Sequence, residues 1–450
     1  MFTLCEIVKI VNGKLIRGKK QRFYNDFSID SRNIQKGALF LAIEGSNNDG
    51  HDFILESIKN GCRGLIIGKN KVDTSLVPGG IDIVEVDDTI NALQQLAKYN
   101  RIKNSKTTLI AITGSNGKTT VKNLISNLLK TKFKVLSTEA NLNNHIGVPL
   151  TLLKLNNHDV CILEMGMNHK GEIKKLSDIS LPDIAVITNI GSAHIGNLGS
   201  IENILNAKLE IVSSLNREGV LLVNSSNYYL KDINIPKIRC ETFGFNIGDT
   251  IFAYDVNLSL KKFKVRNYDD EFCLERIGEA EILNATLLLR FCEYFKIDKK
   301  KVIDIINNQK DSMRLEEIKL ENNICIINDA YNSNLESVGR GLDYIDDLPY
   351  EHKLVALGDM MELGNYSEYY HREVGKLISR YKLEQVFLIG RDIGHAAKEI
   401  SNINVTYNDE VNKKIIQNIK NFLKPNTLIY FKASRGMEFE KLIDLVTKKE

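Results

Sequence analysis

The residues from Thr113 to Thr120 have an order typical of loops that bind phosphate. The segment reads Thr-Gly-Ser-Asn-Gly-Lys-Thr-Thr and follows an apolar, β-branched run at 108–113. Apolar side chains at helical spacing come after it. Glycines permit a tight turn and a close approach of the backbone to phosphate, and the first amides of a helix attract anions. A strand, a glycine loop and a helix in this order predict a nucleotide-binding site.

Particular residues of this loop have distinct expected contacts. The Lys118 ammonium suits the β- and γ-phosphates, and the Thr119 hydroxyl can bind Mg²⁺. Ile112 stands where the general pattern has its first glycine, but the flanking strand and helix favour nucleotide binding over a chance turn. The expected nucleotide contacts are Gly114, Ser115, Asn116, Gly117, Lys118, Thr119 and Thr120.

Acidic side chains follow three apolar runs of the chain. Glu164, Asp329 and Asp359 each come at or just after the end of such a run. In open parallel sheets, ligands gather at the carboxyl ends of the strands, so we expect at least two of these acids to be functional. Glu164 is the best metal-ligand candidate, because the strand beside a phosphate loop often supplies a carboxylate to Mg²⁺. His194, in a loop after the run 184–190, is a second candidate ligand.

Lys208 lies within the apolar stripe of a predicted helix that begins after Ser200, its expected N-cap. Such a lysine either extends its amine to the edge of the stripe or is buried with a depressed pKa. Burial would favour the neutral amine, which can react with CO₂ to form a carbamate. The carbamate would be an anion able to bind a second Mg²⁺.

Short apolar runs and helical patterns alternate over the last two-thirds of the chain. Continuous apolar strands between helices indicate parallel sheets that are covered on both faces. The first ~85 residues have shorter runs and more turn signals. We therefore predict an α/β protein of three domains, at 1–85, 86–311 and 312–450. The runs are 160–163, 184–187, 220–223, 324–327, 354–357, 386–389 and 428–431.

The amino-acid composition restricts the classes of protein to which this chain can belong. The chain has 450 residues, 43% of them hydrophobic and 26% charged, which is ordinary for a globular protein. The net charge of +3 argues against a nucleic-acid partner held by a cationic surface. Seven scattered cysteines without a Cys-x-x-Cys pair fit a reducing compartment. We find no signal peptide and no run long enough to span a bilayer, so we expect a cytoplasmic protein without membrane insertion.

These motifs resemble those of the Mur ligases along nearly the whole chain. The phosphate loop with its isoleucine, Glu164-Met-Gly166, the segment 188–194 and Lys208 resemble the central domain of that family. The segments 30–32, 37–42 and 49–53 resemble its uridine-nucleotide domain, and 141–150 its substrate-side loop. In the last third, Arg314 and the segments 328–334 and 356–364 resemble the branch that adds D-alanyl-D-alanine.

The resemblance implies an α/β fold with an N-terminal UDP-binding domain, a central ATPase domain and a C-terminal Rossmann-like domain. It implies an ATP-dependent amide ligase that joins D-alanyl-D-alanine to UDP-N-acetylmuramoyl-tripeptide through an acyl phosphate, with two Mg²⁺ ions and a carbamylated Lys208. We expect a monomer. The implied catalytic residues are Lys118, Lys208, His194 and Glu164, and the metal ligands are Thr119, Glu164, His194 and Lys208. Further implied nucleotide contacts are Asn284, Arg314, Asp329 and Tyr331. The implied substrate contacts are Ser31, Arg32, Asp49, His51, Asn143, Asn144, Asp359 and Met360.

One segment departs from the family pattern. Where the family has a His-Asn pair near the adenine, this chain has Ala280 and Glu281, and only Asn284 remains. Two alternatives therefore stay open beside the ligase. One is a sibling ligase that adds a single amino acid, or a folate polyglutamate ligase. The other is a nucleotide-binding regulatory protein with impaired catalysis.

Overall fold

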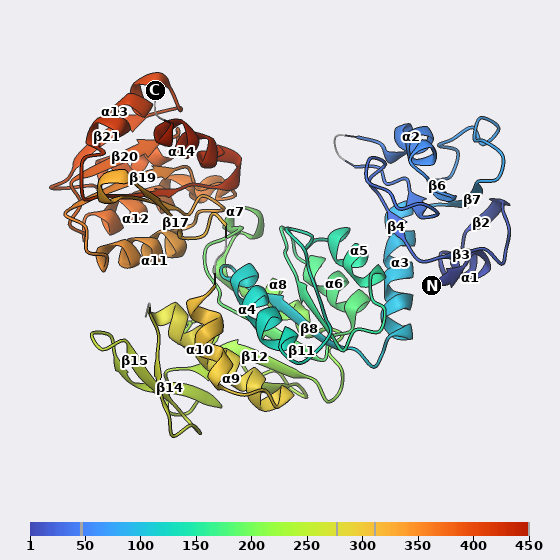
Figure 1. Cartoon of the computed structure of the whole chain (residues 1–450), viewed down its shortest axis with the longest axis horizontal. Coiled ribbons are helices and arrows are strands. Elements are labelled where there is room, and N and C mark those ends of the chain that lie inside the picture. The colour runs from blue at the N-terminus through green and yellow to red at the C-terminus, as the bar shows by residue number, and fades with distance from the viewer. Residues whose placement is uncertain (46–47, 276–277, 310–311, 449–450) are drawn as a thin grey trace.

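The computed structural model describes residues 1–45, 48–275, 278–309 and 312–448 of the chain. They form three lobes in chain order, with the N-terminus in the lobe at one end and the C-terminus in the lobe at the other (Figure 1). Each lobe is built around a β-sheet, and helices pack on the sheets. The predicted α/β class with three parts is confirmed. No helix of the described residues is long and apolar enough to cross a membrane.

The N-terminal lobe contains a five-stranded sheet and a separate two-stranded pair. Four strands of the larger sheet run parallel, and one edge strand is antiparallel. The strands are β1 (Phe2–Thr3), β2 (Lys14–Arg17), β3 (Phe23–Tyr24), β4 (Phe27–Ser28), β5 (Leu39–Leu41), β6 (Gly64–Gly68) and β7 (Asp82–Val86). The helices are α1 (Leu4–Ile10), η1 (Gly50–Phe53) and α2 (Ile54–Lys59).

The central lobe contains a nine-stranded sheet in the order β16-β15-β14-β13-β12-β11-β8-β10-β9. Its strands are β8 (Thr108–Thr113), β9 (Val135–Ser137), β10 (Val160–Glu164), β11 (Ile184–Ile187), β12 (Val220–Asn224), β13 (Arg239–Gly244), β14 (Ile251–Asn257), β15 (Lys262–Val265) and β16 (Glu271–Cys273). Strands β8 to β14 are parallel, and β15 and β16 add an antiparallel edge. Its helices are α4 (Lys118–Lys130), α5 (Gly147–Leu153), α6 (Glu172–Ser180), α7 (Ile195–Leu198), α8 (Ile201–Leu209), η2 (Glu210–Val212), α9 (Glu279–Phe295) and α10 (Lys300–Asn307).

The C-terminal lobe contains a six-stranded sheet in the order β17-β18-β22-β19-β20-β21. All neighbours are parallel except β17, which is antiparallel to β18. The strands are β17 (Glu316–Leu320), β18 (Ile324–Asn328), β19 (His352–Gly358), β20 (Gln385–Ile389), β21 (Asn404–Asn408) and β22 (Thr427–Lys432). The helices are η3 (Glu321–Asn323), α11 (Leu335–Asp346), η4 (Gly364–Tyr366), α12 (Ser367–Ile378), η5 (Ile393–Lys398), α13 (Lys413–Phe422), η6 (Arg435–Met437) and α14 (Phe439–Thr447).

The seven apolar runs of the sequence all form strands. The central strands β8, β10 and β11 are almost entirely buried, as parallel strands covered on both faces must be. The domain boundaries stay predictions. Strand β7 continues to Val86, one residue past the first predicted boundary. The second predicted boundary lies between residues 311 and 312, and residue 311 is outside the described part of the chain.

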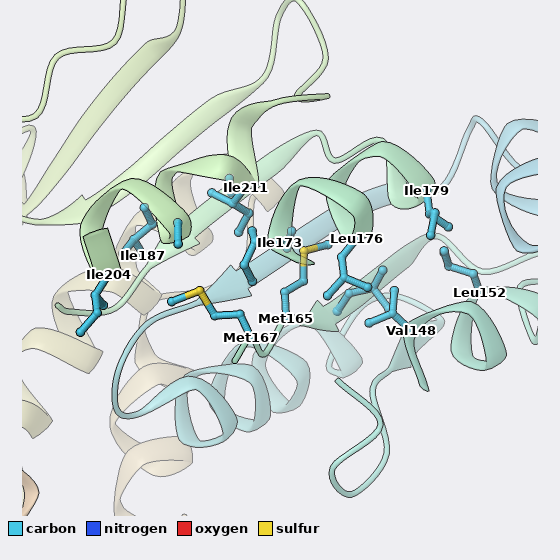
Figure 2. Close-up of a cluster of buried hydrophobic side chains, with 14 of the residues drawn as sticks. Val148, Leu152, Met165, Met167, Ile173, Leu176, Ile179, Ile187, Ile204 and Ile211 are labelled. Atoms are coloured by element: carbon cyan, nitrogen blue, oxygen red, sulfur yellow. The ribbon is translucent and has the colours of Figure 1, made fainter. Parts of the chain in front are cut away.

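A layer of apolar side chains supports the strand ends of the central sheet. Figure 2 shows this layer, in which α5, α6 and α8 pack on one face of the sheet. Two methionines directly after Glu164 are buried in it, and their burial holds the segment that carries this carboxylate. The labelled side chains are Val148, Leu152, Met165, Met167, Ile173, Leu176, Ile179, Ile187, Ile204 and Ile211.

A long helix, α3 (Thr89–Lys103), connects the first two lobes and is held by one buried arginine. Arg101 is 3% exposed. Its guanidinium donates to the carbonyls of Ser180, Leu181 and Thr107 at 2.9–3.2 Å, and to the Asp183 carboxylate at 3.0 Å. One side chain therefore joins the helix to α6 and to the start of two central strands.

Replacing Arg101 by alanine should destabilise the central lobe. The change removes one donor from several carbonyls and from the Asp183 carboxylate, and losing one partner of a buried pair costs about 3 kcal/mol. We expect the melting temperature of the corresponding transition to fall by roughly 5–10 °C in calorimetry. Arg372→Ala is the matched control, because this half-exposed arginine on α12 also pairs with carboxylates. A shift as large for the control would contradict the role given to Arg101.

Candidate active site

The phosphate loop has the predicted form, a strand followed by a turn and a helix. It lies between β8 and α4, and both of its glycines have positive φ angles. Gly114 has φ 153°, and a Cβ atom there would lie 1.9 Å from the Thr188 hydroxyl oxygen. Gly117 has φ 77° at the N-cap of α4. Neither position tolerates a side chain without a change in the loop.

Polar contacts tie this loop to the loop after β11. The amides of Ser115 and Asn116 donate to the Asn189 carbonyl and side-chain oxygens, both at 2.9 Å. The Ser115 hydroxyl contacts Gly191, and the Thr188 hydroxyl donates to the Asn116 carbonyl at 2.6 Å. The two loops therefore form one rigid unit at the carboxyl end of the central sheet.

Lys118 and Thr119 begin α4 beside Glu164. The Lys118 amine donates to the Gly114 carbonyl at 2.7 Å. Thr119 donates to Glu164 at 2.9 Å, and the Asn143 amide donates to the other oxygen of Glu164 at 2.8 Å. Burial lowers the pKa of the Lys118 amine, although part of the side chain stays exposed, and Glu164 opposes this shift. Thr120 is half-buried in the same turn.

Lys208 is buried, so the alternative in which its amine extends to the surface is wrong. Ser200 caps α8 as predicted, and its hydroxyl accepts from the Asn203 amide. Lys208 is 1% exposed, and no hydrogen bond or ion pair joins it to another of the described residues. Burial lowers the pKa of its amine well below the usual value, and the charge of Lys118 lowers it further. Both effects shift the amine toward its neutral form.

The side chain of His194 contacts the C-terminal lobe. Its backbone is left-handed, with φ 66° and ψ 18°. Its Nδ1 atom lies 2.6 Å from an oxygen of Glu362, in a direction that does not make a hydrogen bond. The His194 ring holds the pKa of the Glu362 carboxyl below its usual value.

Among the predicted metal ligands, only Thr119 and Glu164 carry side-chain oxygen donors. Among the described residues, no group of three His, Cys, Asp or Glu side chains lies close enough to hold a metal ion. The Thr119 hydroxyl and the Glu164 carboxylate, 2.9 Å apart, are nevertheless the oxygen donors that Mg²⁺ prefers. No hydrogen bond or ion pair joins the buried amine of Lys208 to a residue in the described part of the chain. The donor set fits Mg²⁺ at Thr119 and Glu164, and a second ion fits only if Lys208 becomes an oxygen donor.

Contacts between the central and C-terminal lobes surround this site. The side-chain amides of Asn116 and Asn334 donate to each other at 2.8 and 3.2 Å. The Ser192 amide and hydroxyl both donate to the Glu336 carboxylate at 2.9 Å. Arg314 reaches from the C-terminal side to the Thr119 hydroxyl at 3.1 Å.

A cavity of about 640 Å³ opens where these two lobes meet. Thr119, Arg314 and Glu362 line it, and the Arg314 guanidinium lies 4.1 Å from the centre of the Tyr331 ring. Its size is that of a small-molecule site, and its wall combines a flat cation, an aromatic ring and the start of α4. The other lining residues are Asn123, Ala140, Asn141, Ser312, Met313, Tyr331, Asn332, Met361, Ser434, Arg435 and Gly436.

Two of the predicted nucleotide contacts lie outside the phosphate loop. Asp329 follows β18 but accepts hydrogen bonds from Lys432 at 2.6 Å and from Tyr430 at 2.9 Å. Asn284 is half-buried in the second turn of α9, which packs on α4. Their contacts to nucleotide stay predictions.

The predicted uridine-nucleotide residues form two neighbouring groups in the N-terminal lobe. Asp49 lies 2.5 Å from the Nδ1 atom of His51, whose Nε2 accepts from the Gly68 amide at 2.9 Å. Ser31 donates to Glu56 on α2, the helix that follows His51. The exposed Arg32 pairs with Asp30, two residues earlier, through two hydrogen bonds of 2.9 and 3.0 Å.

The remaining predicted substrate residues also have contacts within the protein. The side-chain oxygen of Asn144 accepts from the first amide of α5 at 2.9 Å. The Asp359 carboxylate accepts from the amides of Arg391 and Ile393 after β20. Met360 is buried, and its amide donates to His371 at 2.9 Å. Their substrate contacts stay predictions.

Sequence reasoning missed several residues of the site. Asn189, Asn334 and Glu336 connect the loops and lobes, and Glu362 contacts His194. Asn334 and Glu362 lie inside motifs that the sequence makes visible. Their partners are distant in the chain, so no local spacing could have identified them.

Family models match three consecutive parts of the chain. The model described as Mur ligase family, catalytic domain matches residues 24–101. The Mur ligase middle domain matches residues 112–289, and the Mur ligase, glutamate ligase domain matches residues 313–435.

Whole proteins match over nearly their full length. The UDP-N-acetylmuramoyl-tripeptide–D-alanyl-D-alanine ligase of Bacillus subtilis (strain 168) is 35% identical over 456 residues, which cover 99% of this chain and 98% of that protein. A crystal structure of MurF from Acinetobacter baumannii is 28% identical with a TM-score of 0.89 and covers 99% of both chains. The MurF ligase from Thermotoga maritima, solved with ADP, is 25% identical with a TM-score of 0.81 and covers 94% of this chain and 96% of that chain.

Replacing Gly114 by alanine should abolish the phosphate loop's function. The new Cβ would overlap the Thr188 hydroxyl and strain the backbone, so the loop must separate from the loop after β11. We expect affinity for ATP to fall at least about tenfold, a cost of about 1.4 kcal/mol, in titration calorimetry. Gly79→Ala is the control, since a Cβ there meets nothing within 4 Å and no positive φ is required. Unchanged ATP affinity in Gly114→Ala would contradict the assignment of the loop.

Proposed function

This chain belongs to the Mur ligase family, and on that premise we propose that it joins D-alanyl-D-alanine to UDP-N-acetylmuramoyl-tripeptide at the expense of ATP. The observation that carries this proposal is the similarity along the whole chain to ligases named for that reaction. The product is a peptidoglycan precursor. We place the reaction in the cytoplasm and propose that the chain acts as a monomer.

The reaction needs two steps because a carboxylate is a poor electrophile. The carboxylate of the tripeptide attacks the γ-phosphorus of ATP, forming an acyl phosphate and releasing ADP. The amine of D-alanyl-D-alanine then attacks the acyl carbon, and inorganic phosphate leaves as the amide bond forms. The attacking amine loses a proton in this step. Both steps bring negative charges together, so positioning and positive charge should supply most of the catalysis.

The phosphate loop and the lobe boundary provide that positive charge. We assign Lys118 to the γ-phosphoryl group, because its amine already lies against the loop backbone at Gly114. Arg314 also lines the cavity and contacts Thr119, so it can neutralise phosphate from the C-terminal side. The contact between these lobes would also limit the access of water to the acyl phosphate.

Thr119 and Glu164 are the residues we propose to hold one Mg²⁺, and His194 with carbamylated Lys208 would hold a second. Bound Mg²⁺ would reduce the negative charge that opposes attack on the phosphate. Asn143 fixes the Glu164 carboxylate from the side away from Thr119. This keeps one carboxylate oxygen directed toward the start of α4.

Lys208 can form a carbamate without a catalyst of its own. Its neutral amine nitrogen attacks CO₂, and loss of one proton leaves an anionic carbamate. The lowered pKa of the amine favours the reactive form, and the nearby Lys118 charge favours the anion that results. Burial favours the neutral amine that reacts but penalises a buried charge of either sign, so the carbamate anion depends on the nearby positive charge of Lys118 for its stability.

Phosphate release provides the direct test of the substrates. Purified protein with ATP, Mg²⁺, UDP-N-acetylmuramoyl-tripeptide and D-alanyl-D-alanine should release phosphate only when both co-substrates are present. The peptide product should be identified by mass spectrometry. Release with a single amino acid but not with the dipeptide would favour a sibling ligase. Binding of ATP without turnover under any combination would favour a regulatory protein.

Replacing Lys208 by alanine should nearly abolish turnover. The variant cannot form the carbamate. The loss of a group that acts in the transition state lowers kcat more than it raises KM, so we expect the main effect on kcat. A small carboxylate such as acetate should partly restore kcat, because it can occupy the space of the carbamate. Lys208→Arg is the control, since arginine stays cationic and should not be rescued. Wild-type rates in Lys208→Ala would rule out the carbamate.

A further inference from the structure

His194 and Glu362 face each other across the boundary between two lobes, and both have unusual backbones. Their φ angles are 66° and 65°, in the left-handed region that side chains other than glycine seldom adopt. Such conformations persist only where the surroundings impose them, and they gather at functional sites.

Close packing of two loop backbones holds the pair in place. The Gly196 amide donates to the Glu362 carbonyl at 2.9 Å. A Cβ atom on Gly196 would lie 2.5 Å from the Gly364 amide nitrogen, so only glycine allows this approach. Gly364 itself has φ 52°. The contact between His194 and Glu362 is thus part of a built interface between the lobes.

The short contact determines which ring nitrogen of His194 carries a proton. The Glu362 oxygen lies 2.6 Å from Nδ1. Although the direction of the contact is not that of a hydrogen bond, the negative carboxylate so close to Nδ1 favours the ring form with its proton on Nδ1, which leaves Nε2 with a free lone pair. A metal-binding histidine needs such a lone pair, and a partner on the other nitrogen usually selects it.

We propose that Glu362 is a positioning residue for His194, selecting the ring form with a free Nε2 while the C-terminal lobe is docked. The significance of that form rests on the proposed function, in which His194 holds Mg²⁺. The pairing of His194 with Glu362 does not depend on that function. The central lobe would thus gain a competent His194 only when the C-terminal lobe supplies Glu362.

The competing explanation is that Glu362 only holds the lobes together. Other contacts already do so, because Ser192 pairs with Glu336, Asn116 pairs with Asn334, and the Tyr366 hydroxyl donates to the Gly199 carbonyl at 2.6 Å. Glu336 is therefore a matched control, as a carboxylate that bridges the same lobes without contacting His194 in any described interaction.

The test reads the ring of His194 in the nucleotide-free, full-length protein. Histidine labelled with ¹⁵N gives eight ring systems, and His194→Asn identifies the relevant signals in a long-range ¹H–¹⁵N correlation. We expect Nδ1–H in the wild type, a shift toward Nε2–H in Glu362→Ala, and a smaller shift in Glu362→Gln, which keeps the shape of the side chain but lacks its negative charge. Glu336→Ala should leave the His194 signals unchanged.

Kinetics give the second measurement. In Glu362→Ala we expect kcat to fall by roughly 10- to 100-fold, the usual effect of losing a partner of a ligand histidine, with Glu362→Gln in between. The KM for D-alanyl-D-alanine should change by less than about threefold. If Glu362→Ala fails to fold, Glu362→Asp, which withdraws the carboxylate from Nδ1, replaces it in both experiments.

Two results would overturn the proposal. One is a wild-type His194 that carries its proton on Nε2, or whose signals do not change in Glu362→Ala. The other is an equal change in Glu336→Ala, which would show that docking in general orients the ring. A wild-type protein that releases no phosphate would instead contradict the proposed function, while the ring signals would still test the pairing.

Discussion

The hydrogen bonds between the phosphate loop and the loop after β11 are the interaction on which the site depends. The amides of Ser115 and Asn116 donate to Asn189, so the neighbouring loop holds the shape of the phosphate loop. The same neighbouring loop continues to Ser192 and His194, which meet the C-terminal lobe. A change in either loop is therefore transmitted to the ligand side chains and to the boundary between the lobes.

Charge is distributed in this site in a way that costs stability. Two lysines lie close enough for the Lys118 charge to depress the pKa of Lys208, and the carboxylates of Glu164 and Glu362 oppose the lowering of the Lys118 pKa. A fold selected for stability alone would place an apolar side chain at position 208. Groups with perturbed pKa values and strained backbones are typical of catalytic sites, where the rest of the protein compensates for them.

Local patterns were sufficient for the elements of the fold and for part of the site. Continuous apolar runs became buried strands, Ser200 became an N-cap, and the phosphate loop formed between a strand and a helix. These features depend on neighbours within a few residues. The contacts of Asp329 with Lys432 and of Asp359 with the turn after β20 could not be predicted, because each joins segments that are distant in the chain.

By itself, the sequence determined the chemistry that the chain carries: a phosphate-binding loop, carboxylates at strand ends and a lysine in an apolar stripe. Their residue types and periodicity are local properties, and local sterics and burial preferences translate them into structure. Only the tertiary structure decided that Lys208 is buried and that His194 faces Glu362. Burial and charge pairing depend on which surfaces meet when the sheets and lobes pack. The spacing of residues along the chain does not specify which side chains will then be close in space.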